Sequence, residues 1–161
     1  GGGRRGGRSP PLGGTLPKGA TLTGPWSVSA VDSEGNPYPV IVAPISFGIP
    51  LAAPLPEEDA IYWTPQTAGE KAPTECQNED HPGDAGVSNP EAAPGHLCVY
   101  QAVLSGEKEK TTPVVGRIAF LAEGLGASPS GATILIEPKA EAEEEPPAPV
   151  YGVGPWAVTG A

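Results

Sequence analysis

Two similar segments at opposite ends of the chain constrain its fold more than any other feature. GPWSVSA spans residues 24–30 and GPWAVTGA spans residues 154–161. In both segments Trp and Val alternate with small residues, which is the two-residue period of a strand with one buried face. Two copies so far apart do not make a repeat protein, which needs several adjacent units. We therefore expect neighbouring strands of one sheet, with Trp26 and Trp156 in the core.

Glycine and proline punctuate the rest of the chain. There are 23 Gly and 22 Pro among 161 residues, so nearly every window long enough for a helix contains a residue that disfavours helix interiors. Short apolar runs bounded by turn residues recur instead, at residues 38–47, 61–63, 97–104, 114–121 and 132–137. Seven or eight short strands of this kind predict an all-β fold, either a β-sandwich or a small barrel. Because the first and last strands are expected to be neighbours, we expect a β-sandwich of the jelly-roll form, similar to the C1q and TNF heads, with long loops rich in Pro and Gly.

Two of these runs carry more specific expectations. Residues 38–47 hold Pro39 and Pro44, and proline is confined to edge strands or breaks because it cannot donate to the ladder. Residues 97–104 (LCVYQAVL) are apolar on both faces apart from Gln101. This pattern predicts a central strand that is covered on both sides.

Charge divides the chain into a basic start and an acidic body. The chain has nine Lys and Arg and 19 Asp and Glu, which gives a net charge of −10. Four of the basic residues lie in the first twenty residues, which contain no acid: Arg4, Arg5, Arg8 and Lys18. An acidic body repels phosphate, so we expect no nucleic-acid binding. No apolar run is long enough to span a membrane. We expect a flexible Gly/Arg/Pro-rich lead-in over residues 1–19, with residues 1–14 mobile, and a head domain over residues 20–161.

The two cysteines, Cys76 and Cys98, have three possible states. They are too far apart in sequence for a redox motif of the C-x-x-C type, and a disulfide is the leading interpretation. Two buried free thiols, or a metal site completed by His81 and His96, remain as alternatives. A disulfide would pin the long polar stretch 64–96 to the following strand. It would also indicate an oxidising compartment, so we expect an extracellular or cell-surface location.

A search for reactive groups gives no catalytic constellation. His81 and His96 are the usual bases, and no G-x-S-x-G elbow accompanies them. The acids of residues 57–59 are more typical of a solvated turn than of a glycosidase pair. The polar cluster of residues 79–84 lacks the order of an EF-hand and is more typical of a loop tip. We expect no catalytic residue, no metal ion and no cofactor.

Four segments together resemble a known kind of domain. LPKGATLTGPWSVSA, ISFGIPLAAPLP, PEAAPGHLCVY after Cys76, and GPWAVTGA occur in this order and cover most of residues 15–161. They resemble a C-terminal β-sandwich head domain of secreted collagen-like or Gly-rich proteins of high-GC Gram-positive bacteria. The resemblance implies a head that follows a Gly-rich stalk. It carries no catalytic residues over to this chain.

These observations favour a non-enzymatic extracellular head with a structural or adhesive role at the end of a flexible stalk. Heads of this kind are usually trimers, and the apolar segment Ile45–Leu55 is the candidate subunit contact. A glycan or a surface or matrix protein is the expected ligand. The alternative is a secreted carbohydrate-binding or carbohydrate-active module that uses exposed aromatic rings, for which Tyr62 and Trp63 are the candidates. An exposed Trp63 beside a groove would favour this alternative.

Overall fold

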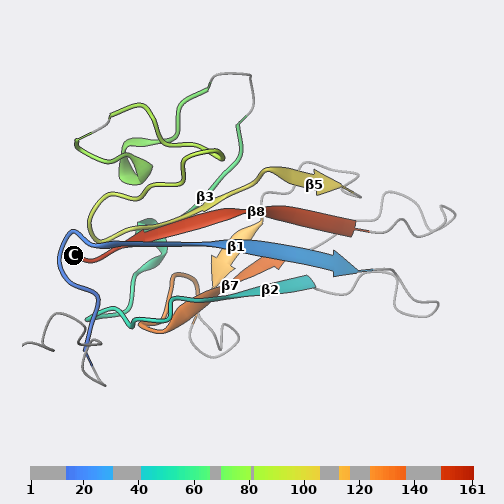
Figure 1. Ribbon diagram of the computed structural model, residues 1–161. Helices are drawn as coiled ribbons and strands as arrows, with labels where there is room; N and C mark the ends of the chain where they lie inside the picture. The colour runs from blue at the N-terminus through green and yellow to red at the C-terminus, as the bar shows by residue number, and fades with distance from the viewer. Residues whose placement is uncertain are drawn as a thin grey trace, which may run out of the picture.

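The computed structural model describes residues 14–30, 41–65, 70–80, 82–105, 113–116, 124–136 and 150–161. Within these residues the chain forms eight strands and two short 3-10 helices, without an α-helix (Figure 1). The strands are β1 (Thr21–Ala30), β2 (Ile41–Ser46), β3 (Ala60–Trp63), β4 (Leu97–Tyr100), β5 (Val103–Ser105), β6 (Val114–Gly116), β7 (Gly131–Ile136) and β8 (Val150–Thr159). The helices are η2 (Glu57–Asp59) and η3 (Thr74–Cys76). The predicted all-β fold is confirmed.

The strands form two sheets that pack face to face. The larger sheet has the order β1-β8-β4-β3, with β5 also paired to β8, and the smaller sheet has the order β2-β7-β6. One cluster of buried apolar side chains, drawn from both sheets, fills the space between them, as expected for a β-sandwich. The pairing of β3 with β4 is parallel, whereas the other pairs are antiparallel. The larger sheet is therefore mixed, and the jelly-roll form is not confirmed.

The two GPW segments are neighbouring strands, as predicted. β1 and β8 pair antiparallel over their full length, and Pro25 stands opposite Pro155. This register places Trp26 opposite Gly154 and Gly24 opposite Trp156. Each motif therefore meets the other in reverse, with the tryptophan of one strand beside the glycine of the other. Both indoles lie in the core, with 2% and 5% of their surface exposed.

The glycines of the two motifs make room for the indoles. A Cβ atom on Gly24 would lie 2.6 Å from the ring of Trp156. A Cβ atom on Gly154 would lie 2.9 Å from Nε1 of Trp26 and would collide with the carbonyl oxygen of Tyr100. The G-P-W pattern is thus a packing device, in which a residue without a side chain faces the largest side chain of the partner strand.

The indole of Trp26 also replaces a missing hydrogen bond of the sheet. Thr159 donates its N–H to the carbonyl oxygen of His96, and every second residue along this antiparallel pair exchanges such bonds. The register, continued from its printed pairs, sets Tyr100 opposite Pro155, which has no N–H. Trp26 instead donates its Nε1–H to the carbonyl oxygen of Tyr100 at 2.9 Å. A buried acceptor is thereby satisfied.

The predicted strand 97–104 is central but not continuous. Val99 pairs with Trp156, whereas Val103 pairs with Val153. The strand has therefore gained one residue relative to β8 between these pairs, which is the arrangement of a β-bulge. The bulge separates β4 from β5 next to Pro155.

The proline rule for strands holds at the position that the structure describes. Pro44 lies in β2, which is at the edge of the smaller sheet and has alternating buried and exposed residues. An edge strand tolerates proline because one of its sides needs no ladder donor. Pro39, the other proline of the predicted segment 38–47, lies outside the described residues.

The chain enters and leaves the sandwich at the same end. Leu16 is buried in the core and donates its N–H to the carbonyl oxygen of Pro50 at 2.8 Å, and Lys18 forms a parallel bridge with Gly160. Figure 1 shows this entry beside the C-terminal residue. Residues 14–19, which the sequence placed in the lead-in, thus pack on the domain because Leu16 is apolar and fills the core. Residues 1–13 lie outside the described residues.

Candidate functional site

The long polar stretch after β3 forms a cap on the outer face of the larger sheet (Figure 1). We define the cap as residues 70–80 and 82–96. Its buried side chains make a second apolar cluster with the outward-facing residues of β4 and β8: Ala72, Cys76, Ala85, Ala92, Cys98, Tyr100 and Ala157. Among its described residues the cap has one helical element, the 3-10 helix η3, so it has little regular structure. The small core shows how a segment with little regular structure is held in place.

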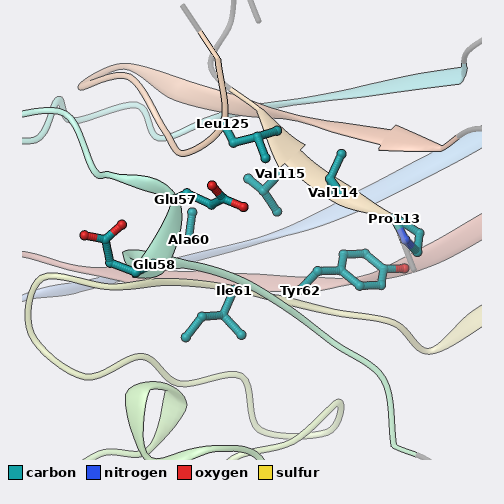
Figure 2. Close-up of a pocket in the computed structure, with 9 residues that line it drawn as sticks. All are labelled: Glu57, Glu58, Ala60, Ile61, Tyr62, Pro113, Val114, Val115 and Leu125. Atoms are coloured by element: carbon teal, nitrogen blue, oxygen red, sulfur yellow. The ribbon is translucent and has the colours of Figure 1, made fainter. Parts of the chain in front are cut away.

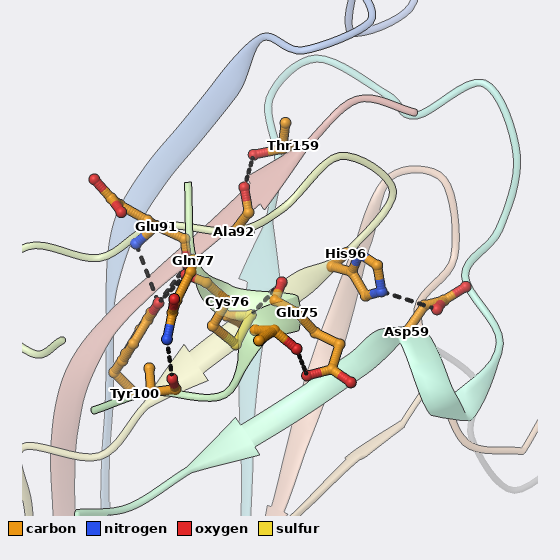
Figure 3. Close-up of a disulfide and its surroundings, with 12 residues drawn as sticks. Asp59, Glu75, Cys76, Gln77, Glu91, Ala92, His96, Tyr100 and Thr159 are labelled. Carbon is orange, nitrogen blue, oxygen red and sulfur yellow. Dashed lines mark hydrogen bonds and ion pairs between the residues drawn. A yellow bond between two sulfur atoms is a disulfide. The ribbon is translucent and has the colours of Figure 1, made fainter. Parts of the chain in front are cut away.

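A disulfide between Cys76 and Cys98 fastens the cap to β4, as predicted. Both cysteines are fully buried. Figure 3 shows the bond beside the hydroxyl group of Tyr100, which faces the carbonyl oxygens of Glu91 and Cys76. The oxygen of Tyr100 also accepts the N–H of Glu91 at 3.1 Å. The hydroxyl group of Tyr100 thus connects two separate parts of the cap, at Cys76 and at Glu91, to the larger sheet.

Reducing the disulfide is expected to destabilise the chain by about 3 kcal/mol, because the bond closes a loop of moderate length in the unfolded state. The loss should appear as a lower urea midpoint in the presence of reductant. Amide exchange should increase mainly in the cap, while β7 remains protected. The double variant Cys76→Ala/Cys98→Ala, which cannot respond to reductant, is the control. Alkylation of two thiols in the unreduced protein would contradict the bond itself.

Burial raises the pKa of Tyr100 to about 12, and the nearby Glu91 carboxylate acts in the same direction. The neutral form is therefore favoured in the folded chain, whereas an unfolded tyrosine titrates near pH 10. It follows that the stabilisation from neutral Tyr100 is complete below about pH 10 and is lost between about pH 10 and 12.

Tyr100→Phe should therefore remove part of the alkaline loss of stability. At neutral pH the same variant should be about 1–2 kcal/mol less stable, because polar groups of the cap lose their partner. Urea unfolding at pH 8 and at pH 11 measures both effects. Tyr151→Phe, at a half-exposed tyrosine, is the control. An unchanged difference between the two pH values in Tyr100→Phe would refute the assignment.

Tyr62 and Trp63, the predicted ligand-binding pair, lie on opposite faces of β3. The ring of Tyr62 faces the sandwich core, 6.1 Å from the ring of Trp26, and its hydroxyl group donates to Oε1 of Gln101 at 2.7 Å. Trp63 is half-buried and packs edge-on against Tyr100, with ring centroids 5.8 Å apart. The two rings therefore form no common platform. Trp63 does not offer the exposed indole that the carbohydrate-binding alternative required of it.

A groove of about 490 Å³ opens between the edge strands of the two sheets (Figure 2). Its lining comes from η2 and β3 on one side and from β6 with its flanking residues on the other: Glu57, Glu58, Ala60, Ile61, Tyr62, Pro113, Val114, Val115 and Leu125. Figure 2 shows the carboxylate of Glu57 directed toward Val115 and Leu125, whereas Glu58 points away. The predicted solvated turn 57–59 therefore forms part of a groove wall.

The groove combines carboxylate groups with apolar side chains. A carboxylate accepts hydrogen bonds, and the side of Tyr62 with its aliphatic neighbours provides apolar contact. Among the described residues that line it there is no His, Ser, Thr, Cys or Lys. This combination suits a ligand that carries hydroxyl or amino groups on an apolar frame.

His96 is engaged through both ring nitrogens. Its Nε2 lies 3.2 Å from Oδ1 of Asp59, and its Nδ1 lies 3.1 Å from the carbonyl oxygen of Pro94. The pair joins η2 to the residue before β4 (Figure 3). A catalytic triad needs one nitrogen for the carboxylate and the other for the nucleophile. In this arrangement the second nitrogen faces a backbone carbonyl group, so the pair is built to hold structure.

Sequence analysis missed an exposed apolar group on the outer face of the larger sheet. Tyr151, Val153 and Val103 expose 50%, 40% and 43% of their surface, and Val103 is the direct partner of Val153. The signal was present in the alternation of β8: residues 151, 153 and 155 have the opposite phase to Trp156.

The predicted subunit contact Ile45–Leu55 is largely used within the chain. Ile45, Phe47, Leu51 and Leu55 are all buried in the core cluster, because they close the sandwich next to Trp156. These side chains are therefore not available to a second subunit. The homotrimer stays a prediction without support from this segment.

Neither a metal cluster nor a membrane-spanning helix occurs in the part of the chain that the structure describes. No group of three or more His, Cys, Asp or Glu side chains converges among these residues, although His81 lies outside them. The described residues also include no helix long and apolar enough for a membrane crossing. Comparisons with protein-family models, with curated proteins and with solved structures find no match to this chain.

Proposed function

We propose that the chain is a non-enzymatic extracellular head domain that binds a surface or matrix ligand. The observation that carries the proposal is the common end at which the chain enters and leaves the sandwich, marked by the bridge between Lys18 and Gly160. A domain attached at that end would keep its sheet faces and its opposite end free for contact. This is the geometry that a stalk-mounted head needs, in line with the resemblance of the sequence to such heads.

The disulfide supports an extracellular role. The disulfide is fully buried, and structural disulfides persist mainly in oxidising compartments. The net charge of −10 would disfavour anionic ligands. The proposed function is thus adhesion by a disulfide-bonded domain.

A binding screen with the full chain tests this function. The protein, coupled to a surface through its N-terminus, is exposed to an array of glycans and to matrix proteins. We expect saturable binding of at least one ligand, with the ligand recovered chemically unchanged. Absence of any saturable binding would contradict the adhesive role. Cleavage or other modification of the ligand would contradict the non-enzymatic character.

The groove supports a second candidate function, a carbohydrate-binding module. The favouring observation is that Tyr62 and the carboxylate of Glu57 line the same groove, since sugars are bound through apolar ring faces and hydroxyl groups. If the groove is the site, Glu57→Gln should weaken glycan binding several-fold, whereas Glu58→Gln, at the residue that points away, should not. Equal binding by both variants would exclude the groove.

A further inference from the structure

The cap covers only part of the outer face of the larger sheet. It buries Cys98, Tyr100, Ala157 and Thr159, and the hydroxyl group of Thr159 donates to the carbonyl oxygen of Ala92 at 2.7 Å. Beyond Pro155 the face emerges from under the cap. The bare part lies toward the start of β8, away from the end at which the described chain enters (Figure 1).

Among the described residues, five on adjacent strands make up this bare part, which we call the outer strip: Ser27, Ser29, Val103, Tyr151 and Val153. Ser27 and Val103 flank Val153 in the register, and Ser29 is paired with Tyr151. Since side chains alternate across a strand, all five point to the same side of the sheet. The strip thus presents one aromatic ring and two aliphatic side chains beside a row of hydroxyl groups.

A shallow hollow continues the strip at the margin of the cap. It has a volume of about 360 Å³, and we call it the proline hollow. Its lining residues are Thr23, Gly24, Pro25, Val87, Pro90, Gly154 and Pro155. Pro25 and Pro155 belong to the sheet, whereas Val87 and Pro90 belong to the cap. From Pro155 to Tyr151 the surface extends for about 13 Å along β8.

Neither the outer strip nor the proline hollow contains a charged residue. The three strands that carry the strip, β1, β5 and β8, have no Asp, Glu, Lys or Arg at all. The chain as a whole holds 19 acidic and nine basic residues. An uncharged surface on an acidic chain offers nothing to pair with an ionic ligand, and the net negative charge of the chain opposes anions.

We propose that the outer strip and the proline hollow together bind a neutral polysaccharide chain. Pyranose rings would lie with their apolar faces on Tyr151 and Val153, and the serine hydroxyl groups would exchange hydrogen bonds with the sugar hydroxyl groups. The length of the surface matches roughly two or three such rings. This inference rests on the proposed binding function and names the ligand class and the site.

The size of the surface distinguishes a glycan from a protein partner. A stable protein interface takes about 20–30 residues from each side. The outer strip and the proline hollow supply twelve residues, several of them small. Small ligands, in contrast, are commonly held by a few apolar contacts and a few polar groups that fix orientation.

Titration calorimetry with neutral oligosaccharides of increasing length, from the cello-, xylo- and chito-series, tests the proposal on the full chain. We expect affinity to rise with length until the strip and the hollow are filled. Tyr151→Ala should weaken binding about tenfold, whereas Tyr151→Phe should retain it because the ring face is kept. Val42→Ser, at an exposed valine on the outer face of the smaller sheet, should have no effect.

Amide exchange gives a second readout that needs no variant. A saturating oligosaccharide should protect residues 151–153 and 103–105 more than the rest of the wild-type chain. Glycan binding that is unchanged in a folded Tyr151→Ala variant would overturn the site and leave the adhesive function standing. Binding only to a matrix protein, or self-association that Tyr151→Ala abolishes, would overturn the ligand class. Absence of binding to every ligand would overturn both proposals.

Discussion

Replacing Gly154 with alanine is expected to lower the free energy of unfolding by about 2–6 kcal/mol. The new methyl group would collide with the backbone oxygen of Tyr100 and would lie 2.9 Å from Nε1 of Trp26. Forcing atoms into a packed core costs about 1–3 kcal/mol. Displacing the indole would also leave the carbonyl group of Tyr100 without its donor, at a further cost of about 1–3 kcal/mol.

Two other glycine substitutions calibrate this effect. Gly24→Ala places its methyl group against the ring of Trp156, so it should be destabilising as well. Gly86→Ala meets nothing within 4 Å and should change stability by less than about 0.5 kcal/mol. Urea unfolding of the four proteins gives the comparison. A Gly154→Ala variant as stable as Gly86→Ala would show that the indole does not lie over β8.

The pairing of the two GPW segments was predictable because local pattern and global position agreed. The alternation of large and small side chains identifies the inward-facing residues of each strand, and the similarity of the two segments favoured equivalent positions for them in one sheet. The reason for the glycine was predictable in principle, since Gly24 and Trp26 share a phase and two antiparallel copies must oppose Gly to Trp. Recognising this requires the pairing register of the two strands. In a hairpin the connecting turn determines the register, but β1 and β8 lie far apart in the sequence and are not joined by a turn.

The candidate binding residues were less predictable, for a different physical reason. The same alternation rule that placed Trp26 inward separates Tyr62 from Trp63, so these neighbours could not share a platform. Which face of β3 would be covered, however, depends on where the cap folds. The cap is held by Tyr100, by a disulfide and by few regular hydrogen bonds. Contacts of this kind leave no periodic signal in a sequence.

The break between β4 and β5 shows a similar limit. Residues 97–104 read as one apolar strand, and their central place in the sheet was predicted. The bulge arises opposite Pro155, a residue 55 positions after Tyr100 in the sequence. The break in one strand thus coincides with a missing N–H on its neighbour. Only the pairing reveals it.

Removing the indole of Trp26 is expected to cost about 3–5 kcal/mol in Trp26→Ala, because the side chain is almost fully buried between the sheets. Trp26→Phe separates packing from hydrogen bonding. The smaller ring keeps much of the apolar contact but leaves the carbonyl group of Tyr100 unsatisfied, since Pro155 cannot donate to it. This variant should still lose about 1–3 kcal/mol.

Trp156→Phe is the matched control for Trp26→Phe. The Nε1–H of Trp156 donates to the carbonyl oxygen of Pro25 at 3.2 Å, in a partly buried position on the edge strand β1. Water can replace this donor at the edge of the sheet, whereas water cannot easily reach the carbonyl group of Tyr100, whose hydrogen bond is buried. Denaturant unfolding should therefore show the larger loss for Trp26→Phe. Equal losses, or a larger loss for Trp156→Phe, would mean that the hydrogen bond across β8 contributes little and that both indoles act only through their volume.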